Sequence, residues 1–173
     1  MDATQIALRI AAALLLGALV GIERERKRRP AGFRTMILVS LGSAAFMLIA
    51  QELVLVPAGR LHPADPDNPA TTLLASSEIS RVLQGLIGGV GFLGAGAVIQ
   101  NKRSVRGLTT AAAIWVTAAI GAACGLGFFV VAAIVSVATL FTLIILELVE
   151  TRFFPDAIQD DTTPSKPTPP PTN

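Results

Sequence analysis

The side chains that could do chemistry lie at the predicted ends of apolar segments. Seven polar residues flank three apolar runs, and we expect all of them at one membrane depth: Glu23, Arg24, Arg34, Thr35, Arg106, Thr109 and Thr110. Glu147 closes the last apolar run at the same predicted depth. Clustered arginines repel one another unless they meet carboxylates, phospholipid headgroups or an anionic ligand, and an arginine can bind a carboxylate through two parallel hydrogen bonds. The pattern therefore predicts a functional cluster of these eight residues.

Two interpretations of this cluster are open. In the first, Arg34 and Arg106 keep the helices in register through Glu23 and helix-end carbonyls, and the cluster forms a cytoplasmic face for a partner. In the second, each arginine separately extends its side chain to the membrane surface and serves only to orient the chain.

The few nucleophiles and metal ligands of the chain argue against catalysis. There is one cysteine, Cys124, one histidine, His62, and no tyrosine, so no disulfide can form within the chain and no Cys/His zinc set can be assembled. Neither residue has the partner that nucleophilic catalysis needs. Asp65 and Asp67 lack the spacing of a calcium loop. We expect no enzyme activity, no metal site, no cofactor and no nucleic-acid partner.

The elements that must position the cluster are membrane helices. Of 173 residues, 52% are hydrophobic and 15% are charged, and the mean hydropathy of +0.63 is too high for a soluble domain of this size. Apolar segments occupy residues 6–22, 35–56, 82–100, 108–122 and 127–149. The sequence therefore predicts an all-α, polytopic membrane protein of about five transmembrane helices. Residues 1–154 form the membrane domain, and residues 155–173 form a disordered tail rich in proline and threonine.

The placement of basic residues predicts the orientation of the helices. Residues 23–34 contain six bases and two acids, and residues 101–107 contain three bases and no acid. Residues 57–80 carry a single base and are interpreted as a long external loop. By the positive-inside rule, both basic loops and the C-terminus are cytoplasmic and the N-terminus is external. The first basic loop is also suited to anionic lipid headgroups, and Arg9 is expected to extend to the membrane interface.

Small residues indicate where helices pack. Gly17 and Gly21 form a small-residue ridge on the first segment. The third segment contains six glycines, each costing about 1 kcal/mol relative to alanine inside a helix; they are Gly85, Gly88, Gly89, Gly91, Gly94 and Gly96. Either other helices pack closely against this segment, or it is locally unwound. Trp115 is assigned to helix packing on the fourth segment.

A long uncharged stretch predicts a helical hairpin. Residues 107–146 are uncharged, and forty helical residues would be about 60 Å long, twice the hydrocarbon thickness. The glycines between residues 121 and 127 predict the turn.

Five sequence blocks carry a family resemblance. They are Gly21-Ile-Glu-Arg24, Ala31-Gly-Phe-Arg-Thr35, Gly91-Phe-Leu-Gly-Ala-Gly96, Arg106-Gly-Leu-Thr-Thr-Ala-Ala112 and Trp115-Val-Thr-Ala-Ala-Ile-Gly121. In number, order and spacing they resemble the signature blocks of the MgtC/SapB family, over about residues 6–148.

The resemblance implies a regulatory protein of the bacterial inner membrane. Members of the family are linked to growth in low magnesium and to survival inside macrophages, and inhibition of the F-type ATP synthase is one reported action. The implied partners are the lipid bilayer, another inner-membrane complex such as ATP synthase, and a second copy of the chain. The virulence-associated members carry a soluble ACT-like domain after the last helix, where this chain has its proline-rich tail. The alternative is a transporter or channel for magnesium or another small solute, with the third helix broken between Gly91 and Gly96.

Overall fold

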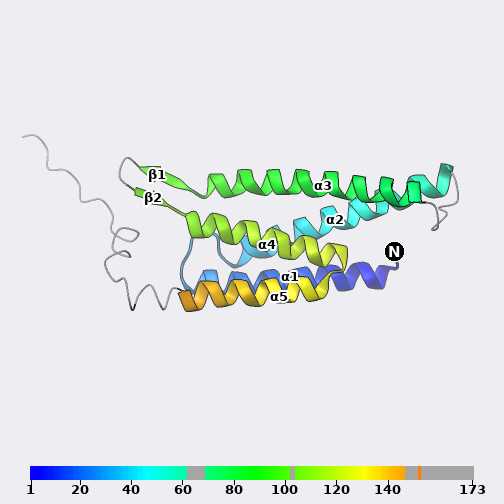
Figure 1. Ribbon diagram of the computed structural model, residues 1–173. Coiled ribbons are helices and arrows are strands. Elements are labelled where there is room, and N and C mark those ends of the chain that lie inside the picture. The colour runs from blue at the N-terminus through cyan, green and yellow to red at the C-terminus, as the bar shows by residue number, and fades with distance from the viewer. Residues whose placement is uncertain (62–68, 102–103, 147–151, 153–173) are drawn as a thin grey trace, which may run out of the picture.

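The fold is a bundle of helices that run roughly side by side (Figure 1). A computed structural model describes residues 1–61, 69–101, 104–146 and 152. The elements are α1 (Ala3–Arg26), α2 (Phe33–Leu61), α3 (Pro69–Gly96), β1 (Ile99–Asn101), β2 (Ser104–Arg106), α4 (Leu108–Leu126), α5 (Phe129–Phe141) and a π-helix, η1 (Thr142–Leu146). Four helices are long and apolar enough to cross a membrane, and Phe129–Ile145 forms a shorter apolar helix. The predicted all-α membrane fold of five helices is confirmed.

The central helix of the bundle is α4. In the most apolar 18-residue stretch of α4, 61% of the residues are buried, compared with 11% in the most apolar 18-residue stretch of α3. Its buried residues Ile114, Ile120 and Cys124 belong to a core shared with Val20 of α1 and Met36 of α2. Because α4 contacts every other helix, its first residues are well placed to meet polar groups from its neighbours.

The predicted turn between the last two helices is placed too early. Instead of ending at residue 122, α4 continues to Leu126, and only Gly127, in the left-handed conformation with φ of 86°, and Phe128 separate it from α5. Gly121 and Gly125 are helical and face α2. A Cβ atom at Gly121 would lie 2.7 Å from the Cα atom of Ser40, and one at Gly125 would lie 2.9 Å from the Cα atom of Ala44. These two glycines permit close helix packing and do not form the turn.

The predicted external loop at residues 57–80 is largely helical. Helix α2 extends to Leu61 and α3 begins at Pro69, where a proline at the first helical position loses no hydrogen bond. The proposed loop residues His62, Asp65 and Asp67 lie outside the described residues, as does the tail at residues 155–173.

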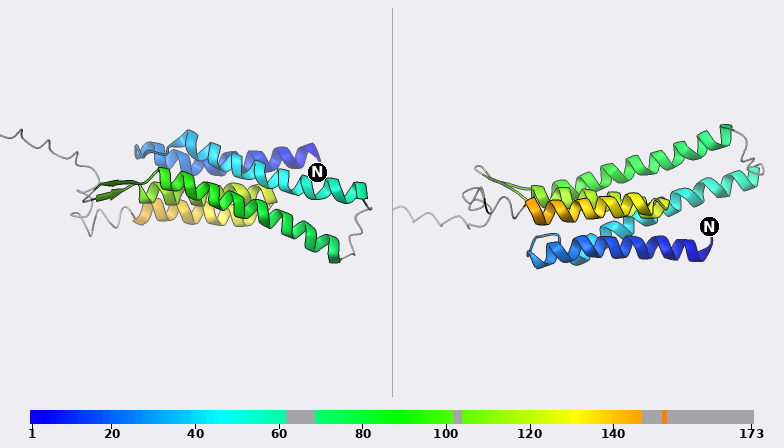
Figure 2. Two further views of the ribbon diagram at one scale, coloured as in Figure 1. Left: turned by 90° about the horizontal axis from the view of Figure 1, so that it is seen from above. Right: turned by 60° about the horizontal axis from the view of Figure 1, so that its bottom comes forward.

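The glycine-rich helix α3 is continuous through Gly96, so the interpretation of a break between Gly91 and Gly96 is wrong. Close packing within the chain does not account for the glycines either. A Cβ atom at five of them would meet no atom within 4 Å: Gly85, Gly88, Gly89, Gly91 and Gly96. Only Gly94 faces a neighbour, at 3.7 Å from the Cβ atom of Ala111 on α4. Figure 2 shows that the first half of α3 diverges from α4 and α5.

A short β-hairpin joins α3 to α4, where the sequence predicted a plain loop. The strands pair in antiparallel register, with Ile99 opposite Arg106 and Asn101 opposite Ser104. Gly107 ends the hairpin with φ of 88°, a conformation that a glycine adopts without steric cost. The hairpin projects from the end of the bundle that also holds the α1–α2 turn and the end of α5 (Figure 1).

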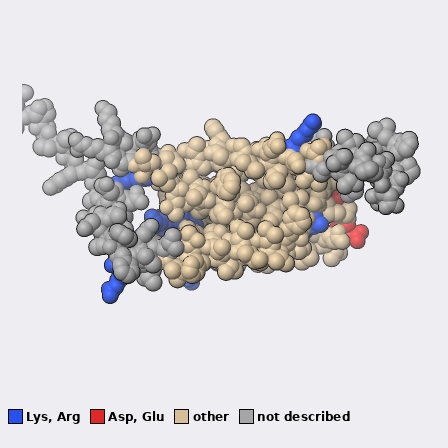
Figure 3. Space-filling view, viewed as in Figure 1, with Lys and Arg blue, Asp and Glu red and all other residues tan. Residues whose placement is uncertain are grey.

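Charged side chains are concentrated at the ends of the bundle. In Figure 3 basic side chains gather at the left end, the right end carries acidic side chains together with a few basic ones, and a broad uncharged band lies between the two ends. Both predicted cytoplasmic loops lie at the left end, as the proposed topology requires. Which end faces the cytoplasm stays a prediction.

Candidate functional site

Arg24 brings a guanidinium group into the interior of the bundle. It follows Ala13, Gly17 and Val20 at helical spacing on one face of α1, and all four are buried. The Arg24 residue is 2% exposed, and its Nη2 atom donates a hydrogen bond of 2.7 Å to the Thr110 Oγ1 atom on α4. A charge removed from water in this way needs hydrogen-bond partners, and the Thr110 hydroxyl is one that also links α1 to α4.

The next turn of α1 links the helix to the end of α5. Glu23 is 8% exposed, and its Oε1 atom lies 3.0 Å from the Nζ atom of Lys27. The Lys27 Nζ atom also donates a hydrogen bond of 3.0 Å to the carbonyl oxygen of Leu143 in η1. Leu143 is the second residue of η1, and a π-helix departs from the regular hydrogen-bond pattern of the α-helix. The C-terminal end of α1 is thereby attached to η1, which follows α5, as well as to α4.

The predicted cluster of eight residues is brought together only in part. Glu23, Arg24 and Thr110 belong to the buried contacts, and Arg106 ends the hairpin before α4. Arg34, Thr35 and Thr109 are exposed, and Glu147 lies outside the described residues. The ion pair of Glu23 is with Lys27, a residue that the sequence analysis counted only among the loop bases. Its spacing of four residues from Glu23 was the signal that could have identified it.

Arg9 forms a second polar contact at the opposite end of the bundle. Its Nη1 atom donates to the Gln51 Oε1 atom at 2.6 Å and to the carbonyl oxygen of Gly125 at 2.7 Å. The Arg9 guanidinium thus binds α2 and the C-terminal end of α4, and its predicted extension to the membrane interface stays a prediction. A cation at that end also interacts favourably with the helix dipole.

The glycine ridge of α1 permits the close contact with α2. A Cβ atom at Gly17 would lie 2.7 Å from the Cβ atom of Ser40, and one at Gly21 would lie 2.9 Å from the Cα atom of Phe33. In contrast, Trp115 is 52% exposed and lines an apolar cavity of about 240 Å³ between α3 and α4.

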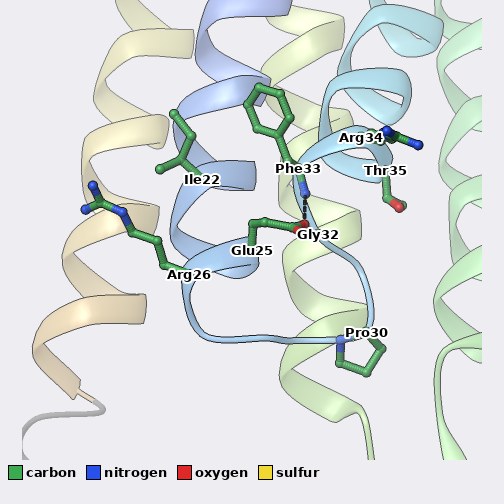
Figure 4. A pocket seen from close by; sticks show the side chains of 8 residues that line it. All are labelled: Ile22, Glu25, Arg26, Pro30, Gly32, Phe33, Arg34 and Thr35. Carbon is green, nitrogen blue, oxygen red and sulfur yellow. Dashed lines mark hydrogen bonds between the residues drawn. The ribbon is translucent and has the colours of Figure 1, made fainter.

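A larger cavity, of about 620 Å³, lies at the α1–α2 turn (Figure 4). Its lining residues are Ile22, Glu25, Arg26, Pro30, Gly32, Phe33, Arg34 and Thr35. The Glu25 Oε2 atom accepts a hydrogen bond of 3.0 Å from the backbone N–H of Phe33, the first residue of α2. Two residues of the predicted cluster, Arg34 and Thr35, thus line this cavity and take no part in the buried contacts.

A bundle of apolar helices with arginine and lysine contacts between helices at its ends defines a multi-pass membrane protein. The chain belongs to the MgtC family, whose model matches residues 10–152.

Curated relatives agree with this assignment. The chain is 41% identical to Protein SrpB of Synechococcus elongatus over 80% of this chain and 72% of the relative. It is 40% identical to Protein MgtC of Salmonella typhimurium over 70% of this chain, and 36% identical to Protein MgtC of Brucella abortus over 74% of this chain. The matched regions cover 44% and 45% of those two MgtC proteins, less than half of their length. No solved structure matches the chain.

Proposed function

We propose that this protein is a regulatory protein of the bacterial inner membrane that supports magnesium homeostasis by acting on another membrane complex, the F-type ATP synthase. Membership of the MgtC family supports the proposal. In a pathogenic host strain, the same action would serve growth in low magnesium and inside macrophages. The protein transports nothing itself, and it catalyses no reaction.

The observation that supports this proposal is that charged side chains at the basic end bind neighbouring helices. Arg24 binds Thr110 on α4, and Lys27 binds Glu23 on its own helix and Leu143 near the end of α5. These contacts hold three helices together beneath the exposed bases of the same end, Arg26, Arg28 and Arg34. A fixed basic face suits a surface that another complex binds, whereas a transporter needs helices that move or are broken near the substrate.

Two further observations favour a regulator over a channel or an enzyme. A channel would need α3 to be broken between Gly91 and Gly96, but α3 is helical through Gly96. Cys124 is fully buried in the helix core, which argues against a nucleophilic role.

The test reconstitutes the full chain with purified bacterial F-type ATP synthase in liposomes. We expect the protein to slow ATP-driven proton pumping, measured with a pH-sensitive dye, and Arg24→Ala to abolish the inhibition. The control is Arg28→Gln, which removes an exposed base of the same segment. A second set of liposomes holds the protein alone with a magnesium-sensitive dye inside. Magnesium entry without inhibition of the synthase would replace the regulator with the transporter.

A further inference from the structure

The structure divides the six bases of the first basic loop into two groups. Three of them make contacts within the chain: Arg24, Lys27 and Arg29. Three are exposed, and no hydrogen bond or ion pair is recorded for their side chains: Arg26, Arg28 and Arg34. Bases that serve only to orient the chain need not be divided into a bound group and an exposed group. The three exposed bases are therefore candidates for binding a ligand.

Two of the three exposed bases line one cavity. Arg26 from α1 and Arg34 from α2 are among the lining residues of the 620 Å³ cavity, and Arg28 is not. Figure 4 shows the two arginines at opposite edges of the cavity, with Glu25 and Phe33 between them and both guanidinium groups extending outward. The cavity therefore has a cation on each side.

The beginning of α2 adds hydrogen-bond donors to this cavity. Glu25 accepts the N–H of Phe33, and the N–H of Met36 binds the carbonyl oxygen of Gly32. Among the described residues, no acceptor is recorded for the N–H groups of Arg34 and Thr35. The first N–H groups of a helix point toward its N-terminus and favour an anion there.

Apolar residues share the lining with the cations. Ile22 is 41% exposed and Phe33 is 37% exposed. Both residues continue into the apolar faces of helices that cross the membrane. A ligand that carries an anionic group beside a hydrocarbon chain would meet both kinds of surface at once.

We propose that this cavity binds the phosphate headgroup of an anionic phospholipid, with Arg26 and Arg34 as its cationic contacts. Guanidinium groups bind phosphate with charge-assisted hydrogen bonds, and phospholipid phosphates lie at the membrane depth of the bundle end. Glu25 opposes an anion, but two guanidinium groups against one carboxylate leave a net charge of +1 in the lining. Ile22 and Phe33 contact the glycerol end of the acyl chains. This binding site is independent of any action on the ATP synthase.

Native mass spectrometry of the full chain in detergent tests the proposal. Phosphatidylglycerol is titrated against phosphatidylcholine as the zwitterionic control, for the wild type and for Arg26→Gln, Arg34→Gln and Arg28→Gln. We expect retention of phosphatidylglycerol to weaken at least tenfold in the first two variants and less than twofold in Arg28→Gln. Equal losses in all three variants would reduce the site to diffuse attraction by the basic loop and overturn the proposal.

Two further measurements separate folding and ligand source from lipid binding. Because all three arginines are exposed, their variants should unfold at the wild-type temperature without lipid, and phosphatidylglycerol should raise that temperature in the wild type and Arg28→Gln only. Inorganic phosphate and glycerol 3-phosphate at millimolar concentration are then added as competitors. Displacement of phosphatidylglycerol by either would show a site for a free phosphate, and the lipid assignment would be wrong.

Discussion

Arg24, in the last turn of α1, and Lys27, directly after the helix, are three residues apart, yet they bind different helices. The difference follows from position on the helix, because Arg24 continues the buried face of Val20 and Gly17, while Lys27 faces the end of α5. The burial of Arg24 could be expected from the sequence, since small and apolar residues precede it on the same face. The identity of Thr110 as its acceptor could not, because that depends on how far α4 is shifted along α1.

The contact between Arg24 and Thr110 should appear as an energetic coupling. A hydrogen bond from a charged donor contributes about 1.5–3 kcal/mol, so a double-mutant cycle of Arg24→Met and Thr110→Val should give a coupling of this order. The measurement is the unfolding free energy in mixed detergent micelles. Thr109→Val, on the exposed neighbour, is the control and should show no coupling with Arg24→Met. Additive effects at Thr110 would contradict the contact.

Lys27 should matter chiefly through the charge that it neutralises. Replacing Lys27 by methionine leaves the buried Glu23 carboxylate without its cation, and breaking such a pair costs about 3–5 kcal/mol. The double variant Lys27→Met with Glu23→Gln removes both charges and should regain much of that loss in the same unfolding assay. If the double variant is as unstable as Lys27→Met alone, the contact with the Leu143 carbonyl, and not the ion pair, dominates.

At the scale of the elements, the glycines of α3 and α4 behave in opposite ways. Sequence alone suggested close packing for α3 and a turn for α4, because a glycine run is compatible with either. The structure resolves the ambiguity through the neighbouring helix. Gly121 lies against the backbone of Ser40 on α2, while Gly91 meets nothing within 4 Å. The β-hairpin could not be predicted for a different reason, since its strands of three residues each are too short to show an alternating pattern.

One substitution made in both helices should therefore have opposite effects. Gly121→Ala places a methyl group 2.7 Å from the Ser40 Cα atom and should destabilise by about 1–3 kcal/mol through overpacking. Gly91→Ala should be neutral or should stabilise by up to about 1 kcal/mol through helix propensity. Thermal unfolding of both variants in detergent measures the difference. Destabilisation by Gly91→Ala would show that a second molecule or helix packs against α3, as self-association of the chain would require.

At the scale of the whole molecule, the ends of the bundle differ in charge and in what they hold. The basic end gathers the α1–α2 turn, the hairpin and the last turn of α5, and the opposite end holds the N-terminus and the Arg9 contact with Gln51. The number of apolar helices and the grouping of the basic loops could be predicted from sequence, because hydropathy and charge are local properties. The contact of Arg9 with two helices could not be, since it depends on how α2 and α4 are positioned along α1.

The orientation of this bundle can be measured with single cysteines in a Cys124→Ala background, because Cys124 is the natural cysteine of the chain and is buried. Asp2→Cys labels the N-terminal end, and Arg28→Cys and Val105→Cys label the α1–α2 turn and the hairpin; all three positions are exposed. With nine bases in the two basic loops, the positive-inside rule places the turn and the hairpin in the cytoplasm. In intact cells with a permeable outer membrane, a thiol reagent that cannot cross the inner membrane should therefore modify Asp2→Cys alone. Disruption of the inner membrane should make the other two positions react, which is the control that they are accessible. Modification of Arg28→Cys and Val105→Cys, but not Asp2→Cys, from the outside would invert the topology and place the basic end outside the cytoplasm.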